Sequence, residues 1–362
     1  MVVGHVRGIF FVDYEDIVRP NLALKALYLL TGLGHQSVVV FFVLSGFFVG
    51  SSALSNRTRW SWRRYLLRRS SRLYVVLIPA LLLTALLDRT GMALFGTGGV
   101  YGGQIYARYL TLANVSLTGN AATFMGNLLF LQGRFVDSFG SNGPLWSLPY
   151  EFWSYMLFPL CVQALARTVA IPRRALHIAI AIFILCACDA QLFFYFPVWL
   201  IGAAVAAVWQ RWRCKRPLPR IALRSLGLLA FAAAVLVGRL RFFGSRRAED
   251  AVLGIGTGML LMVLLITSRM VSGSLKNIYG RFAAHFASFS FTLYAVHFPA
   301  LLLINAAVLR GGGRWLPDPA HLISATALCA ALVWCWGWPV ARLTEAHTDV
   351  VRMRLGKMLE IE

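Results

Sequence analysis

The sequence predicts an all-α integral membrane protein with about ten transmembrane helices. Hydrophobic residues make up 59% of the 362 residues and charged residues only 14%, whereas a soluble domain is about one quarter charged. The mean hydropathy is +0.68. Apolar stretches of about 20 residues recur along the chain, and each is long enough to cross a hydrocarbon layer of roughly 30 Å. These observations indicate a chain that crosses the membrane many times.

Nine complete spans follow from hydropathy and loop charge. The apolar segment 121–132 is too short to cross, so we expect a re-entrant or interfacial helix there. The first residues, MVVGHVRGIFF, are typical of the second half of a helix. We expect them to be part of a truncated tenth span. The nine complete spans are 34–54, 73–90, 148–168, 174–190, 192–209, 221–239, 250–269, 286–309 and 319–341.

The distribution of basic residues predicts the orientation. Segment 55–72 holds seven arginines and is assigned to the cytoplasm. Alternating the spans from there places roughly two thirds of the basic residues, and both termini, on the cytoplasmic side. The loop 239–250 runs against this rule, because its four arginines fall outside. We therefore predict a multi-pass protein of the inner (plasma) membrane with both termini in the cytoplasm.

The net charge of +21 does not indicate nucleic-acid binding. The basic clusters fall between apolar spans and never form one folded basic domain, so nucleic acid is excluded as a partner. The cysteines and histidines show no metal-ligand spacing, and no metal site is predicted. Oligomeric state is not encoded in any pattern that the sequence presents.

His5 is the first candidate for chemistry, because ionisable groups inside a membrane are costly and mark functional sites. A histidine with a pKa of about 6.5 can take a proton from a hydroxyl group and return it, as acyl transfer to an alcohol requires. A histidine that is hydrogen-bonded within a helix bundle is the alternative.

Arg69 and Arg72 are the second candidates, within RWSWRRYLLRRSSRLYVVLIPALL (59–82). Most arginines of this stretch fix the topology. These two lie one turn apart on one face where the apolar helix begins, and a guanidinium pair of this kind suits a phosphate.

Ser45 and Gly46 interrupt the apolar run GHQSVVVFFVLSGFFVG (34–50). Two small residues allow a ligand or another helix to approach the backbone closely. A passing acyl chain and plain helix packing both fit this pattern.

Glu151 lies at the start of an apolar segment, in NGPLWSLPYEFWSYMLFPL (142–160). Trp146 and the flanking prolines form a rigid aromatic entry at the membrane interface. An ionised carboxylate inside a bundle needs a partner, and the candidates are His5 or an arginine that faces inward. A neutral, proton-sharing glutamic acid is the structural alternative.

Taken together, these segments resemble acyltransferase family 3, whose members are membrane proteins that O-acylate cell-surface glycans and related acceptors. Five short motifs occur in the family's order between about residue 3 and residue 347. The residues that carry the resemblance are Ser45 and Gly46; Arg69, Arg72, Tyr74 and Pro79; Trp146, Ser147, Leu148, Glu151, Tyr155 and Pro159; Ser290, Leu293, Tyr294 and His297; and Glu345.

The resemblance implies an acyl-CoA donor, usually acetyl-CoA, that enters from the cytoplasm, and a sugar hydroxyl as acceptor. It places the family's arginine pair on Arg69 and Arg72 and its histidine on His5. An arginine that precedes this histidine in the family would lie before Met1, so we expect that part of the first helix is missing. It also implies a stand-alone type without a hydrolase-like domain, with the transmembrane domain at 1–347 and a cytoplasmic tail at 348–362.

We therefore predict a membrane O-acetyltransferase of polysaccharides, with His5 as general base and Glu151 as the group that orients or balances it. Arg69, Arg72, Ser45 and Gly46 would contact acyl-CoA. Trp146, Tyr155 and His297 are further candidates, His297 with either a catalytic or a structural role. The acceptor is a glycan or lipid-linked saccharide, and acetyl-CoA is a co-substrate rather than a tightly bound cofactor.

Two other function classes fit the same composition. A transporter or flippase of a glycan or small molecule also places polar residues in a bundle core, although no inverted repeat is visible. The second class is a non-catalytic family member that binds acyl-CoA.

Overall fold

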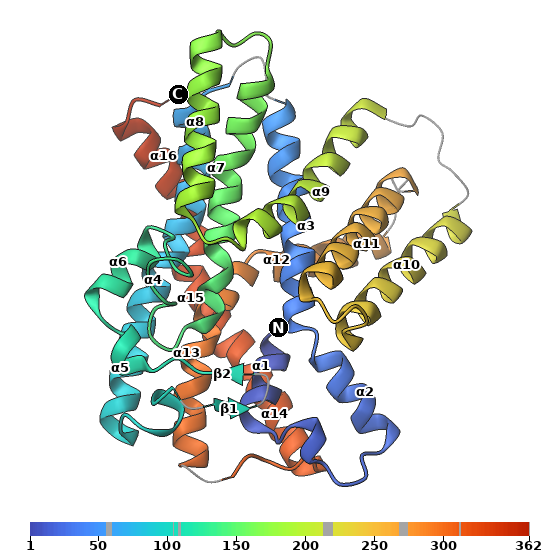
Figure 1. The fold of residues 1–362 in the computed structure, drawn as a ribbon. Helices are drawn as coiled ribbons and strands as arrows, with labels where there is room; N and C mark the ends of the chain where they lie inside the picture. The colour runs from blue at the N-terminus through green and yellow to red at the C-terminus, as the bar shows by residue number, and fades with distance from the viewer. Residues whose placement is uncertain are drawn as a thin grey trace. The chain divides into compact units, whose positions relative to one another are not determined.

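The computed structural model describes residues 1–55, 60–103, 105–107, 110–212, 220–267, 274–310 and 313–361. These residues form helices and one small hairpin of two strands (Figure 1). Among the described residues, seven helical segments are long and apolar enough to cross a membrane, which confirms the prediction of an all-α membrane protein. The seven are Leu22–Ser55, Trp62–Phe95, Leu192–Arg211, Ile221–Leu240, Arg246–Thr267, Ser290–Leu309 and Pro319–Met358.

The chain divides into two compact units, and each is built from separate stretches of sequence. The first unit comprises Met1–Gly34, Ser61–Trp146 and Asn277–Glu362. The second comprises His35–Trp60 and Ser147–Lys276. Membership of a unit therefore does not follow chain order, and two residues far apart in sequence belong to the same core.

The first unit contains the N-terminal helix, the longest helix and the C-terminal helices. Its elements are α1 (Val2–Phe10), α2 (Leu22–Thr31), α4 (Trp62–Phe95), β1 (Ile105–Ala107), β2 (Leu110–Thr111), α5 (Val115–Thr118), α6 (Ala121–Leu128), most of α12 (Ser274–Ala287), α13 (Ser290–Leu309), α14 (Pro319–Ala331), a π-helical stretch (Leu332–Gly337), α15 (Trp338–Leu343) and α16 (Thr348–Met358), with 3-10 turns at Tyr14–Asp16, Gly99–Tyr101, Gly143–Ser147 and Glu345–His347.

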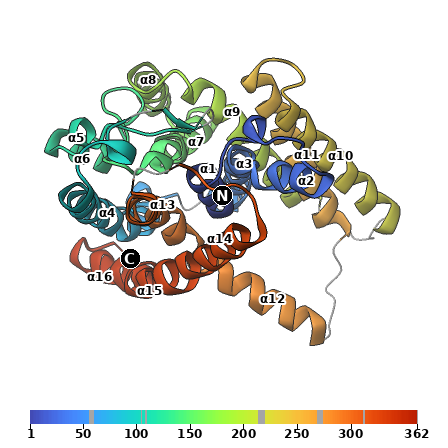
Figure 2. The same cartoon turned by 90° about the horizontal axis from the view of Figure 1, so that it is seen from below.

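Helix α4 organises this unit. Its first turn is capped by Ser61, whose hydroxyl accepts from the Arg64 N–H at 3.4 Å. It ends at Gly96, whose φ of 83° suits a residue without a Cβ. Helices α13 and α16 both pack on α4. Figure 2 shows α14, α15 and α16 following one another, and α14 packs on α1, α15 on α13 and α16 on α4.

The second unit is a set of six long helices: α3 (Gly34–Ser55), α7 (Leu148–Leu165), α8 (Ile171–Ala187), α9 (Leu192–Trp212), α10 (Arg220–Leu240) and α11 (Arg246–Thr267). Here α10 packs on α11, α11 on α9, and α7 on both α8 and α9.

Several elements differ from the sequence predictions. Segments predicted as loops or tail contain α2, α12, α16 and the hairpin. Of these, α2 and α16 fall within the candidate spans Leu22–Ser55 and Pro319–Met358, which extend further than the predicted spans 34–54 and 319–341. Helices α7 and α8, predicted as spans, have 18 and 17 residues and are not among the seven described candidates. Segment 121–132 holds only the eight-residue α6. The basic residues at 56–59, 213–219 and 268–273, which entered the orientation argument, lie outside the described residues.

Candidate active site

His5 lies in the middle of α1, which neighbouring elements of the first unit hold in place. The ring of Phe10 packs on that of Trp315 with centroids 4.6 Å apart. The Trp315 N–H donates to the Phe10 carbonyl at 2.6 Å. Gly4 faces α2 so closely that an added Cβ would lie 2.6 Å from the Thr31 carbonyl oxygen. These contacts fix the position of α1 and therefore the position of the His5 backbone.

The side chain of His5 pairs with His297 of α13. The Nδ1 of His5 lies 2.7 Å from the Nε2 of His297, and the two ring planes differ by only 4°. His297 is completely buried. The ring of Phe298 contacts His5 edge-on, with centroids 5.0 Å apart. The two histidines therefore form a hydrogen-bonded pair with apolar packing around it.

The surroundings of His297 determine the tautomers of both rings. The Nδ1 of His297 lies 2.9 Å from the carbonyl oxygens of Leu293 and Tyr294. Carbonyl oxygens only accept, so this Nδ1 carries the proton and the Nε2 of neutral His297 has a lone pair. The Nδ1–H of His5 therefore donates to that lone pair. It follows that the Nε2 of neutral His5 is the nitrogen that is able to accept a proton.

Asn142 supports the helix that carries His297. Pro299 lies inside α13 and has no N–H to donate to the carbonyl of Ala295, four residues earlier. The side-chain amide of Asn142 donates to this carbonyl at 2.8 Å and to Thr84 of α4 at 3.0 Å. Asn142 is fully buried. It therefore satisfies a carbonyl that proline leaves without a helical partner, close to His297 in the chain.

Glu345 fixes the beginning of the same helix. Its Oε2 accepts from the backbone N–H of Thr292 at 3.1 Å and from the Thr292 hydroxyl at 2.8 Å. The first N–H groups of a helix have no partner within the helix, so this carboxylate serves as a cap. The hydroxyl of Tyr294 in turn donates to the carbonyl of Pro144. Three residues of the resemblance motifs therefore have structural contacts at α13. Glu345 caps its first turn, Tyr294 connects it to Pro144, and His297 contacts two of its backbone carbonyls.

Glu151 lies in a second polar cluster, inside the second unit. The carboxylate is 5% exposed and accepts from the Tyr155 hydroxyl, one turn further along α7. The Ser45 hydroxyl lies 3.4 Å from the same carboxylate oxygen and 3.1 Å from the Tyr155 hydroxyl. The indole N–H of Trp199 donates to Ser45 at 3.3 Å. Ser45, Glu151 and Tyr155, chosen separately from sequence, therefore form one hydrogen-bonded cluster.

Gly46 lies beside this cluster and faces a helix backbone. A Cβ at Gly46 would stand 1.9 Å from the Trp199 carbonyl oxygen, and one at Gly202 would stand 1.8 Å from the Val43 carbonyl oxygen. Helices α3 and α9 thus approach each other through glycines on both sides. Close helix packing, one of the two interpretations of the sequence, occupies this face of Gly46.

Arg69 and Arg72 both lie in the first turns of α4. The Arg69 guanidinium is half-buried and stacks over the ring of Tyr65, 5.6 Å from its centroid. The Arg72 side chain is exposed and interacts electrostatically with Glu345. Trp146 is half-buried in the 3-10 turn that precedes α7.

The predicted site residues therefore fall into separate groups. His5, His297, Arg69, Arg72 and Trp146 belong to the first unit. Ser45, Gly46, Glu151 and Tyr155 belong to the second. Within the described part of the chain, no group of three or more histidine, cysteine, aspartate or glutamate side chains is placed to hold a metal ion.

Several buried polar groups were not predicted from the sequence, and Asn142 is one of them. Its neighbours in the stretch SNGP were the available signal. Another is the pair of His35 and Asp250, with the imidazole 2.8 Å from a carboxylate oxygen. Asp250 follows Glu249 at the start of an apolar helix, and both acids are buried. Two adjacent acids at the end of a predicted span were the signal there.

Comparison with known proteins gives the family. Curated proteins and solved structures yield no match to the chain. A family model described as an acyltransferase domain matches residues 1–337. The match includes α1 with His5, the pair Arg69 and Arg72 of α4, Glu151 and His297, and it stops before Glu345. Because it covers most of the sequence, it confirms the resemblance: this multi-pass membrane protein belongs to acyltransferase family 3 and is an acyltransferase.

Proposed function

We propose that this protein transfers an acyl group, acetyl by preference, from acyl-CoA to a hydroxyl group of a surface or secreted glycan or a lipid-linked sugar. The observation that carries the proposal is the contact of His5 Nδ1 with His297 Nε2, together with the carbonyl contacts of His297 Nδ1. From these contacts we assign the proton of His5 to Nδ1 and the lone pair to its Nε2. The family match supports acyl transfer in general. It favours the enzyme over the transporter alternative.

The chemistry uses this lone pair in one of two ways. In direct transfer, Nε2 takes the proton of the acceptor hydroxyl, the oxygen attacks the thioester carbonyl, and the C–S bond breaks. The proton then passes from His5 to the leaving CoA thiolate. In the second route, Nε2 itself attacks the thioester carbonyl, the C–S bond breaks and CoA leaves as a thiolate. The acceptor hydroxyl then attacks the acyl-histidine, the C–N bond breaks to restore His5, and the hydroxyl proton ends on the CoA thiolate. In both, His297 stabilises the charge that develops on the His5 ring.

The remaining site residues have supporting roles in the proposal. Arg69 and Arg72 bind phosphate groups of CoA from the cytoplasmic side of an inner membrane, where both chain termini lie. Guanidinium groups suit this task because they bind phosphate through two parallel hydrogen bonds. Glu151, as an acceptor inside its cluster with Ser45 and Tyr155, supplies a fixed negative charge that supports transfer.

The test is ester-linked acetyl on envelope glycans of a bacterial strain from which the gene has been deleted. The strain is complemented with the unchanged chain, with His5→Ala or with His347→Ala, a control at an exposed histidine. We expect the unchanged chain and the control to restore the acetyl esters and His5→Ala to restore none. Restoration by His5→Ala at equal membrane abundance contradicts the assigned base. Identical glycans in all strains contradict the glycan acceptor.

A further inference from the structure

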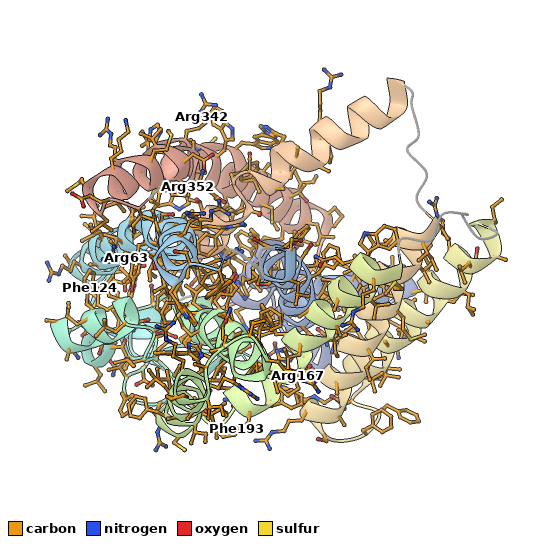
Figure 3. All side chains as sticks on the ribbon, turned by 90° about the horizontal axis from the view of Figure 1, so that it is seen from above. Arg63, Phe124, Arg167, Phe193, Arg342 and Arg352 are labelled. Carbon is orange, nitrogen blue, oxygen red and sulfur yellow. The ribbon has the colours of Figure 1, made fainter. Side chains whose placement is uncertain are left out.

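The first turns of α4 and helix α16 line an open, strongly basic cavity of about 890 Å³. Its charged lining consists of five cations and one acid: Arg63, Arg64, Arg68, Arg352, Lys357 and Glu360. Arg352 also pairs with the exposed Asp349 at 3.1 Å. Figure 3 labels Arg63 on α4 and Arg352 on α16.

The cavity also lies at a helix N-terminus. Ser61, the N-cap of α4, is part of its lining. The free N–H groups of a helix start carry partial positive charge and favour anions. The lining therefore combines arginine and lysine side chains with the positive end of a 34-residue helix. A phosphate group matches this chemistry.

An apolar groove of about 570 Å³ continues from the cavity along α4. The groove and the cavity share Arg63, Leu67 and Ile361. Beyond these, the groove is lined by Val75 and Ile78 of α4 and by Leu355 of α16. Because Ile78 is 42% exposed within a candidate membrane span, this side of the groove faces lipid.

The length of the groove fits a membrane lipid. Arg63 and Ile78 lie on one helix, and the rise of 1.5 Å per residue separates them by about 22 Å. One leaflet of the hydrocarbon layer is about 15 Å deep. A ligand with its phosphate at Arg63 and its acyl chain beside Ile78 would therefore span one leaflet.

This cavity is lined by other arginines of α4 than the pair assigned to the predicted donor site. Arg64 and Arg68 are one turn apart and face α16. Arg69 stacks on Tyr65 and Arg72 interacts with Glu345. At 3.6 residues per turn, Arg69 points about a third of a turn away from Arg64 and Arg68. Arg72, four residues after Arg68, lies closer to their face but is absent from the cavity lining.

We propose that the cavity and groove bind one anionic phospholipid, with its phosphate among the five cations and an acyl chain in the groove. Helix α16 supplies half of this site and lies outside the residues that match the family. The bound lipid links α16 to α4. It thereby holds the first turns of α4, which also carry Arg69 and Arg72.

The test measures lipid affinity of the purified full chain by native mass spectrometry. The probes are phosphatidylglycerol and phosphatidylcholine with identical acyl chains. We expect the unchanged protein to prefer phosphatidylglycerol. The double variant Arg68→Gln with Lys357→Gln should bind it about tenfold more weakly, because each basic group near a membrane surface contributes to attraction of anionic lipid. The matched control is Arg89→Gln with Arg354→Gln, which removes one exposed arginine from each of the same helices outside the cavity.

A second variant tests the groove without changing charge. Val75→Trp fills the groove and should weaken the binding of both lipids while the preference for phosphatidylglycerol stays. Equal affinity of the unchanged protein for both lipids overturns the proposal. So does an equal loss in the control double variant. Displacement of phosphatidylglycerol by added CoA also overturns it, because the cavity then belongs to the acyl donor.

Discussion

At the scale of single residues, the account depends on which nitrogen of His5 carries its proton. Replacing His297 by Phe removes the acceptor of the His5 Nδ1–H and frees the ring to adopt the other tautomer. We expect the turnover number to fall about a hundredfold, within the range that positioned general bases contribute. The KM for acyl-CoA should stay unchanged, because His297 does not contact the donor in this account.

The variant His297→Gln separates positioning from packing. The Gln side-chain oxygen is an acceptor and should restore part of the activity lost in His297→Phe. Steady-state kinetics of both variants in membranes gives the comparison. Equal loss in both variants, with poor membrane insertion, would mean that His297 has a purely structural role.

Glu151 gives a second prediction at this scale. The change Glu151→Gln keeps the size of the side chain and its bonds with the Ser45 and Tyr155 hydroxyls, but removes the negative charge. Acyl transfer should fall strongly while the amount of inserted protein stays the same. Tyr155→Phe, which removes one of the two hydroxyl donors and leaves the charge, should cost less. Wild-type turnover in Glu151→Gln would exclude the assigned role.

Single residues were predictable where one residue type in an apolar stretch was itself unusual. His5 and Glu151 were singled out in this way, and His297 through the family resemblance. Their partners were not predictable, because His5 and His297 are separated by 292 positions and only the fold brings them together. Asn142 was missed because its role arises from a proline in another element.

At the scale of elements, Asn142 and Pro299 should be energetically coupled. Asn142→Ala leaves the Ala295 carbonyl buried without a donor, which costs about 1–3 kcal/mol. In the background of Pro299→Ala, residue 299 regains its N–H, and the same change at Asn142 should cost less. A double-mutant cycle on thermal unfolding in detergent measures the difference. Strictly additive effects would show that Asn142 does not serve this carbonyl.

The contact between α3 and α9 gives a prediction with a control on the same helix. Gly46→Ala forces its Cβ against the Trp199 carbonyl and should destabilise by about 1–3 kcal/mol, as overpacking does. Gly34 has nothing within 4 Å of its added Cβ, so Gly34→Ala should change stability by less than about 0.5 kcal/mol. The measurement compares the unfolding temperatures of the two variants with that of the unchanged protein. Equal stability would show that α3 and α9 tolerate a wider separation.

The long apolar helices were predictable because a bilayer demands local apolar length and internal backbone hydrogen bonding. Helices α2, α12 and α16 were missed, and α2 and α16 continue candidate spans beyond the predicted bounds 34–54 and 319–341. The interpretation of Gly46 stayed open in the sequence, because a gap for a ligand and a gap for a helix use the same small residues.

At the scale of the whole molecule, composition predicted a multi-pass membrane protein, and the order of five motifs predicted its family. The division of the chain into two discontinuous units was not predictable, because contacts between distant stretches define them. The arginines of segment 55–72 received one common explanation, topology, apart from Arg69 and Arg72. In the fold, Arg63, Arg64 and Arg68 line a cavity with α16, a helix that hydropathy did not reveal.

The most direct test of the central claim uses membranes that contain the protein and acetyl-CoA with a radiolabelled acetyl group. The account predicts release of free CoA together with ester-linked label on glycan, and loss of both in His5→Ala at equal protein abundance. Release of CoA and labelled ester by His5→Ala at the rate of the unchanged protein would contradict it.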